Sequence, residues 1–391
     1  MIDATLLSYM QEQLSQTSLV FKRYKYGQID WDLRMIGLMG PRGIGKTTLL
    51  LQRIIESGQA DNSLYVSADH SYFSIHSLVE VADEFVKQGG EYLYLDEVHK
   101  YTNWSRELKQ IYDTHPALHV VFTGSSVLDI LKGEADLSRR AIAYTMQGLS
   151  FREYLELFHG ITAQVFSLEQ ILRGEVRIKE LPHPLPYFNQ YLKSGYYPFA
   201  KEKAFFTRLE QMVTQTVEMD IPQFANMSVS TARKLRQMLA IVATLVPYKP
   251  DASALAAELK ISRNVVPDYL LYLEKAGMIG QLRDATGGMR GLGKTEKVYL
   301  DNTNLMFALG GDKVEMGNVR ETFFYNQTRE TSDVMASKVA DFKIGDYTFE
   351  IGGKNKTQRQ IAGIDNAYIV KDDTEYAFRN EVPLWMFGFL Y

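Results

Sequence analysis

Short apolar runs alternate with amphipathic stretches along the first 146 residues of the chain. Two stretches carry apolar residues at helical spacing, at residues 47–56 and 75–87. Five runs have the length of buried strands, at residues 34–39, 63–67, 92–96, 119–123 and 141–146. This alternation predicts a parallel sheet with helices on both faces, and the ligand of such a sheet lies at the carboxyl ends of its strands.

The pattern changes after residue 150. Residues 151–230 are mostly helical, but prolines interrupt them, so a helical lid with a loop insertion is predicted. Residues 231–300 give three helices and a hairpin, the layout of a winged helix. The rest of the chain gives a helix followed by alternating strands. The predicted fold class is α/β, with domains at 1–150, 151–230, 231–300 and 301–391.

The segment from Gly40 to Thr48 lies between the first predicted strand and the first predicted helix. Its residues from Gly40 to Thr47 fit G-x-x-x-x-G-K-[ST], the phosphate-binding loop of P-loop NTPases. In that context the backbone N–H groups and the helix dipole converge on one point, which favours a polyphosphate. The expected nucleotide-binding residues are Gly40, Arg42, Gly43, Ile44, Gly45, Lys46, Thr47 and Thr48. Lys46 would reach the β- and γ-phosphates, and the Thr47 hydroxyl would bind Mg²⁺.

A second segment, from Gly288 to Thr295, fits the same pattern. No apolar strand precedes it, and the residues that follow look like a strand rather than a helix. No helix dipole would therefore point at this loop, and we interpret it as a glycine-rich wing.

Two carboxylates, Asp96 and Glu97, end the apolar strand at 92–96. Such a pair is often only a solvated strand end. One βαβ repeat downstream of a phosphate loop, it matches the Walker B pattern. Asp96 would then hold Mg²⁺ through water, and Glu97 would polarise the attacking water.

Two further places could sense the γ-phosphate. Thr123 or Ser125, after the fourth strand, could contact it directly, although Ser125 could equally cap the next helix. Arg139 or Arg140 could act as an arginine finger, in the same chain or in a neighbouring copy. A surface ion pair at a helix end is the alternative for the two arginines.

The composition of the chain argues against several classes of protein function. The chain has 391 residues, 46% of them hydrophobic and 23% charged, as in folded globular proteins, and its net charge is −4. It contains no cysteine, so disulfides and thiolate zinc sites are excluded. No H-E-x-x-H or G-x-S-x-G motif supports a zinc or serine hydrolase. The N-terminus lacks the regions of a signal peptide and no apolar stretch is long enough to span a bilayer, so a cytoplasmic location without membrane contact is expected.

Several motifs together resemble a large bacterial and archaeal family of AAA-like ATPases. They are the blocks at residues 40–50, 95–99, 123–126, 138–140 and 149–154, with Trp104. The resemblance implies a P-loop core, a helical lid, a winged helix and a C-terminal nuclease-like domain of unknown function. It also implies ATP rather than GTP as the nucleotide. The expected function is Mg²⁺-dependent binding and hydrolysis of ATP, whose nucleotide state controls the accessory domains; a homo-oligomer is a further expectation.

The predicted winged helix suggests a partner. Residues 231–300 carry eleven Lys or Arg and six Asp or Glu, a net charge of +5 that fits DNA contact. The helix expected at 264–277 would be the recognition helix, but it carries few basic residues. Because winged helices also mediate protein contacts, a nucleotide-dependent DNA-binding switch remains one alternative function.

The C-terminal part suggests a second alternative, an ATP-gated nuclease. Glu321, Asp341 and Glu350 are spaced like the metal-binding acids of restriction-endonuclease-like folds, which hold Mg²⁺ for phosphodiester hydrolysis. That fold usually has a lysine two residues after the second acid, but here Gly352 holds that place and the next lysine is Lys354. We therefore expect a nuclease fold without cleavage activity. The final residues, 383–391, are expected to form a buried strand.

Overall fold

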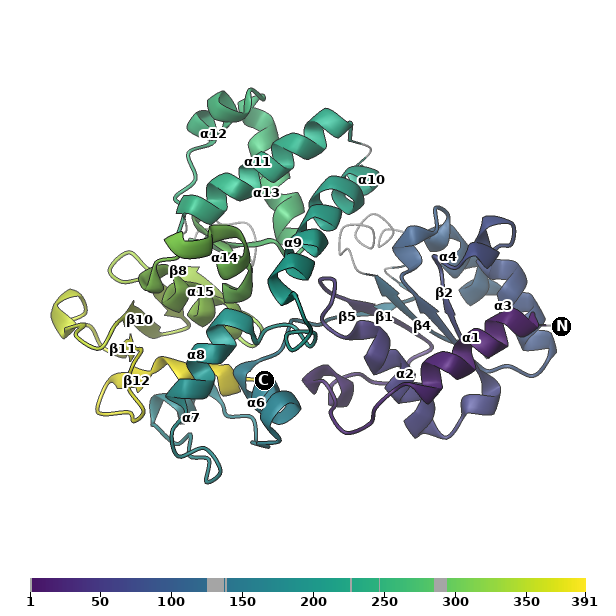
Figure 1. The fold of residues 1–391 in the computed structure, drawn as a ribbon, viewed down its shortest axis with the longest axis horizontal. Coiled ribbons are helices and arrows are strands. Elements are labelled where there is room, and N and C mark those ends of the chain that lie inside the picture. The colour runs from purple at the N-terminus through teal and green to yellow at the C-terminus, as the bar shows by residue number, and fades with distance from the viewer. Residues whose placement is uncertain (1, 125–136, 138, 226, 246, 285–293) are drawn as a thin grey trace. The chain divides into compact units, whose positions relative to one another are not determined.

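The computed structural model describes residues 2–124, 137, 139–225, 227–245, 247–284 and 294–391. The chain forms two compact units, Met1–Gln147 and Gly148–Tyr391. Figure 1 shows the first unit in purple and blue and the second in teal, green and yellow.

The first unit is built on a five-stranded sheet in the order β2-β3-β4-β1-β5, in which all four pairings are parallel. Four of the five strands, all but β5, are almost fully buried, which fits their continuous apolar sequences. The bounds of the strands agree with those predicted to within about two residues: β1 (Met35–Met39), β2 (Ser63–Ser67), β3 (Tyr92–Asp96), β4 (His119–Gly124) and β5 (Ile142–Thr145).

Helices α1 (Ala4–Ser15), α2 (Lys46–Ser57), α3 (Leu78–Lys87) and α4 (Trp104–Thr114) accompany this sheet. The predicted first helix is confirmed as α2. The predicted helix at 75–87 begins later, at Leu78, because Ser77 and Glu80 form a capping box that fixes its start.

The second unit opens with helices α6 (Phe151–His159), α7 (Leu168–Leu172), α8 (Leu185–Ser194), α9 (Phe205–Gln215) and α10 (Ile221–Ala225). A π-helical turn, Thr216–Asp220, joins α9 to α10. The three helices expected in the winged helix follow as α11 (Val229–Leu245), α12 (Ala252–Leu259) and α13 (Val266–Lys275), and the hairpin as β6 (Ile279–Arg283) and β7 (Thr295–Leu300). The predicted order of three helices and a hairpin is therefore present.

That hairpin belongs to a larger sheet, which the sequence did not predict. The sheet has seven strands in the order β12-β11-β10-β9-β8-β6-β7, because β6 also pairs with β8. Its other strands are β8 (Val334–Ala336), β9 (Phe342–Ile344), β10 (Tyr347–Gly352), β11 (Ala367–Lys371) and β12 (Glu381–Pro383). This sheet thus contains strands from both sides of residue 300, where a domain boundary was predicted. Helices α14 (Thr303–Gly310) and α15 (Met316–Thr328) lie between β7 and β8 in the chain.

The end of the chain differs from the prediction. After β12, residues Leu384–Phe389 form a 3₁₀-helix, and all six are buried. Burial is as expected, but the strand is not formed. A helical turn presents side chains on every side, so Trp385, Phe387 and Phe389 can pack against different neighbours, including Phe324 and Phe151.

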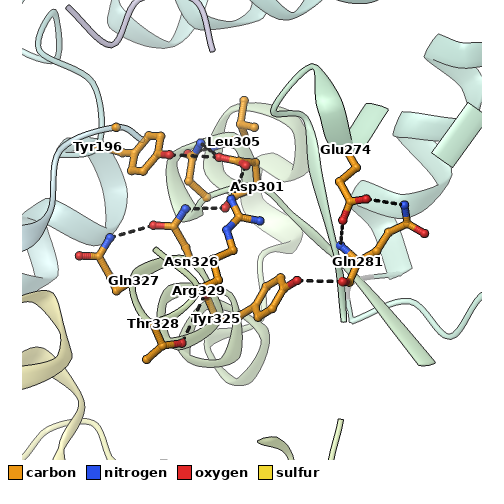
Figure 2. Close-up of polar contacts among 12 residues, drawn as sticks. Tyr196, Glu274, Gln281, Asp301, Leu305, Tyr325, Asn326, Gln327, Thr328 and Arg329 are labelled. Carbon is orange, nitrogen blue, oxygen red and sulfur yellow. Dashed lines mark hydrogen bonds and ion pairs between the residues drawn. The ribbon is translucent and has the colours of Figure 1, made fainter. Parts of the chain in front are cut away.

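A buried polar network lies inside the second unit, around the end of β7 (Figure 2). Asp301 forms an ion pair with Arg329, and the Tyr196 hydroxyl donates to Asp301 Oδ2 at 3.3 Å. The Asn326 amide donates to the Asp301 carbonyl oxygen, and the Gln327 amide donates to Asn326 Oδ1, both at 2.8 Å. The network thus joins the residues after α8, the end of β7 and helix α15.

Candidate functional site

The loop between β1 and α2 has the backbone of an anion-binding loop. Gly40, Gly43 and Gly45 have φ angles of 149°, 72° and 95°, which favour glycine. A Cβ at Gly40 would lie 2.3 Å from the Met146 carbonyl oxygen, so only glycine fits there. The loop leads directly into the N-terminus of α2, where free N–H groups favour a phosphate.

Lys46 is buried and folded against this loop. Its Nζ donates to the carbonyl oxygens of Gly40 at 2.8 Å and Pro41 at 2.7 Å. Burial lowers the pKa of Lys46 to about 8, so the side chain is still mostly protonated at neutral pH. The loop therefore holds a cation whose present partners are neutral carbonyl groups, and a phosphate would be a stronger partner.

Other residues expected in the loop differ in exposure. Arg42 is half-buried, Ile44 is buried and Thr48 is exposed. The buried guanidinium of Arg23 donates to the carbonyl oxygens of Ile44 and Gln147, the latter at 2.7 Å. Arg23 therefore links the loop to Gln147, the last residue of the first unit.

Asp96 ends β3 in the same region, and both of its oxygens accept hydrogen bonds. Thr47 Oγ1 donates to Oδ2 at 2.7 Å. Thr123 Oγ1 and the Glu97 N–H both donate to Oδ1, the latter at 3.1 Å. The structure thus brings together Thr47 at the start of α2, Asp96 at the end of β3 and Thr123 near the end of β4. Hydroxyl and carboxylate oxygens of this kind fit Mg²⁺.

Glu97 follows Asp96 in a strained conformation. Its φ is 52°, a region that non-glycine residues rarely adopt, and such outliers gather at functional sites. Its Oε2 lies 3.4 Å from Nε2 of His99. Burial, followed by nearby cations, lowers the pKa of His99 to about 2, so this histidine is neutral and lends the carboxylate no positive charge.

The expected γ-phosphate sensors are only partly described. Thr123 is fully buried and accepts a hydrogen bond from the Glu97 N–H at 3.0 Å. Ser125 lies outside the described residues. Arg140 makes two 2.9 Å hydrogen bonds to the carboxylate of Asp113, which is the surface-pair arrangement, whereas Arg139 is exposed.

Glu321 and Asp341 in the second unit both contact the same lysine. Lys297 Nζ is 3.1 Å from Glu321 Oε2 and 3.2 Å from Asp341 Oδ1. The Tyr299 hydroxyl also donates to Glu321 Oε2 at 2.7 Å. Burial, together with the Asp341 carboxylate, raises the pKa of Glu321.

Glu350, on β10, is paired with a lysine that the sequence did not single out. Its Oε1 contacts Nζ of Lys356, while Lys354 is exposed. Burial raises the pKa of the Glu350 carboxyl group. Within the described ranges, no group of three or more His, Cys, Asp or Glu residues is arranged to hold a metal ion. Each of the three acids is thus paired with a lysine, and a role of these acids as metal ligands stays a prediction.

The second match to the phosphate-loop pattern lies mostly outside the described residues, at 285–293. Its last residue, Thr295, begins strand β7 and not a helix, as expected for this segment. In the part of the chain that the structure covers, no helix is both long enough and apolar enough to cross a bilayer.

Two residues that no predicted motif contains, Tyr65 and Arg23, make hydrogen bonds at the site, whereas His99 belongs to the motif at residues 95–99. Tyr65 donates a hydrogen bond to Asp96 Oδ2, and Arg23 and His99 contact the loop and Glu97 as described above. The one available signal was chemical: a tyrosine in a buried strand needs a partner for its hydroxyl. The sequence does not say which partner that is.

Two known protein families match parts of this chain. The AAA domain family matches residues 32–155. A domain family of unknown function matches residues 185–315, and it spans both of the boundaries predicted at 230 and 300. Most of the first unit is therefore similar to the AAA domain family, and its five-stranded parallel sheet fits a P-loop NTPase core.

A curated relative is an uncharacterized protein, MJ1637, of Methanocaldococcus jannaschii. It is 26% identical over 310 residues, which is 70% of this chain and 65% of the relative. The match thus spans less than two thirds of that relative. Similar solved structures include a Walker-type ATPase of Pyrococcus abyssi, with 12% identity, a TM-score of 0.42 and coverage of 79% of this chain and 96% of that one. AMPPCP-bound DnaA from Aquifex aeolicus has 14% identity, a TM-score of 0.26 and coverage of 70% and 89%.

Proposed function

We propose that this chain binds ATP with Mg²⁺ at the loop from Gly40 to Thr48 and hydrolyses the ATP. The observation that carries the proposal is the hydrogen bond between Thr47 and Asp96. It places the hydroxyl that would bind the metal and the carboxylate that would hold it through water next to each other, beside a buried lysine.

Each residue then has a role in the reaction. Lys46 and the loop N–H groups bind the β- and γ-phosphates and neutralise their charge. Mg²⁺, when bound, withdraws charge from the same phosphates, with Thr47 and Asp96 holding it. Glu97 orients the attacking water and accepts its proton, and neutral His99 lies beside that carboxylate. Thr123 keeps Asp96 and the backbone of Glu97 in place.

The arginines extend the proposal to an assembly of several copies. Since Arg140 is held by Asp113, we assign the finger role to Arg139, whose exposed side chain could reach the nucleotide of a neighbouring copy. An Arg139→Ala variant should then lose hydrolysis but keep nucleotide affinity, and mixing it with a Lys46→Ala variant should restore part of the activity.

A nucleotide-dependent DNA switch is the second candidate function. The observation that favours it is the turn between α12 and α13, where Lys260 and Arg263 are both exposed within a segment of net charge +5. DNA affinity at low salt that is the same with and without ATP would exclude this candidate.

The ATPase proposal is tested by the variant Glu97→Gln. It should bind ATP as tightly as the unaltered chain and hydrolyse it far more slowly, with no hydrolysis by either in EDTA. Glu91→Gln is the matched control, because Glu91 is exposed and precedes the opposite end of β3. Hydrolysis by Glu97→Gln at the unaltered rate would refute the role of Glu97.

A further inference from the structure

Asp96 has a hydrogen-bonding partner that the phosphate-loop motifs do not contain. Tyr65, on β2, is 1% exposed, and its hydroxyl donates to Asp96 Oδ2 at 2.9 Å. The same oxygen accepts from Thr47 Oγ1 at 2.7 Å. This oxygen thus accepts two hydrogen bonds, one from the start of α2 and one from β2.

The strand register puts the tyrosine in this position. Strands β2 and β3 are parallel, and Ser67 pairs with Asp96. Tyr65 lies two residues before Ser67, so it points to the same face of the sheet as Asp96 and reaches it diagonally. A shorter side chain at this position could not span the distance.

The N-terminal helix α1 holds Tyr65 from its other side. The ring of Tyr9 stacks on that of Tyr65 with 6.0 Å between centroids and 17° between planes. Because the Tyr65 hydroxyl donates to Asp96, the contact with Tyr9 is one between rings. The Tyr65 N–H lies 3.3 Å from the sulfur of Met10, and α1 packs against β2. A chain of contacts therefore runs from α1 through Tyr65 to Asp96; α1 is the purple helix in Figure 1.

We propose that Tyr65 is a positioning residue for magnesium: its hydroxyl orients the Asp96 carboxylate, and helix α1 sets the place of Tyr65. This inference rests on the proposed function, since it concerns the metal of the same site. Partners in the outer shell of a metal fix the orientation of the groups that hold it, and their removal typically weakens metal affinity about 10- to 100-fold. Among the described residues, the Tyr65 hydroxyl makes no hydrogen bond to the loop from Gly40 to Thr48, so its effect should be confined to the metal.

A purely structural tyrosine would behave differently. If the hydroxyl only provides a hydrogen bond to a buried carboxylate, removing it would lower the stability of the protein but would leave the magnesium requirement unchanged. The matched control is Tyr94, which pairs with Tyr65 across β2 and β3 and is 2% exposed. Among the described residues, its hydroxyl makes no hydrogen bond to Asp96, whose oxygens accept from Thr47, Tyr65, Thr123 and the Glu97 N–H.

The test compares Tyr65→Phe with Tyr94→Phe in the full chain. Binding of a fluorescent ATP analogue is titrated with Mg²⁺, and affinity for the analogue is also measured in EDTA. We expect Tyr65→Phe to raise the half-saturating Mg²⁺ concentration about 10-fold and to leave the affinity in EDTA unchanged. Tyr94→Phe should change neither quantity, although thermal unfolding should show that both variants lose stability.

A Mg²⁺ midpoint for Tyr65→Phe within about twofold of the unaltered chain would overturn the inference. Should Tyr65→Phe not fold, Tyr9→Ala decides, because it removes the ring that stacks on Tyr65 and leaves Tyr65 itself in place. That variant should shift the midpoint about threefold in the same direction, and an unchanged midpoint would count against the inference. If the unaltered chain shows no Mg²⁺-dependent binding, the proposed function itself fails, which is a distinct result.

Discussion

Thr47 Oγ1 donates a hydrogen bond to Asp96 Oδ2 at 2.7 Å, although the two residues are 49 positions apart in the chain. The contact joins the start of α2 to the end of β3. Parallel pairing through β4 brings these ends to one edge of the sheet. The hydrogen bond between Thr47 and Asp96 is the structural basis of the proposed magnesium site.

The first prediction concerns Asp96. Asp96→Asn keeps the shape of the side chain but replaces one oxygen by an NH₂ group, which cannot accept from the hydroxyl donors. We expect the Mg²⁺ concentration for half-maximal hydrolysis to rise about 10- to 100-fold. Stability should fall by about 2 kcal/mol, as measured by urea unfolding.

Asp113→Asn is the control for this change. Asp113 lies on the same unit but is exposed and pairs with Arg140, so its replacement should leave stability nearly unchanged. Equal Mg²⁺ requirements for Asp96→Asn and Asp113→Asn would show that Asp96 does not hold the metal.

The second prediction concerns the pH dependence of ATP binding. Burial lowers the pKa of Lys46 to about 8 in the free protein. A bound triphosphate favours the charged form, so the pKa of Lys46 is higher in the complex. Binding must then take up a proton wherever the free lysine is neutral, and ATP affinity should fall as the pH rises above 8, by up to about tenfold per unit.

Calorimetry in two buffers of different ionisation enthalpy measures this proton directly. About half a proton should be taken up per ATP at pH 8, and about a tenth at pH 7. Binding at pH 8 without proton uptake would mean that Lys46 does not meet the phosphates.

The third prediction concerns the buried ion pair shown in Figure 2. Asp301 is 3% exposed, and Arg329→Met would leave its carboxylate without its cation inside the second unit. We expect a loss of about 3–5 kcal/mol in the free energy of unfolding. The double variant with Asp301→Asn should lose less, because no unpaired charge remains buried.

Arg208→Met provides the matched comparison, since the pair of Arg208 with Glu202 is exposed. Its loss should be below about 1 kcal/mol. Similar losses for the two arginine variants would contradict a structural role for the network around Asp301.

The fourth prediction concerns the acids of the second unit. Because Lys297 lies between Glu321 and Asp341, we expect no DNA cleavage by the full chain with Mg²⁺ or Mn²⁺. Lys297→Met should lower stability by about 2 kcal/mol, since two partly buried carboxylates lose their cation. Plasmid or single-stranded DNA that is cut by the unaltered chain, but not by Asp341→Ala, would establish a nuclease instead.

The sequence predicted the first unit well because its signals are local. Each strand is a continuous apolar run, and the glycines, Lys46 and Thr47 stand together in one motif. Asp96 and Glu97 follow at the end of a strand. Parallel-sheet topology alone then implies that these residues meet.

The remaining features depend on contacts between distant parts of the chain. Tyr65 reaches Asp96 through the strand register, and Arg23 reaches Ile44 through a loop, neither of which a local pattern encodes. Lys297 enters the acid cluster because β6 and β7 extend the C-terminal sheet. The division of residues 148–391 into lid, winged helix and nuclease-like domain stays a prediction, since these residues form one compact unit with a shared sheet.

The most direct test of the account is equilibrium binding of ATP in the presence of Mg²⁺, measured on the unaltered chain and on Lys46→Ala. The account predicts one ATP per chain for the unaltered protein and no measurable binding for the variant, with both proteins folded by circular dichroism. Binding of equal affinity to both would contradict the assignment of the loop from Gly40 to Thr48 as the nucleotide site.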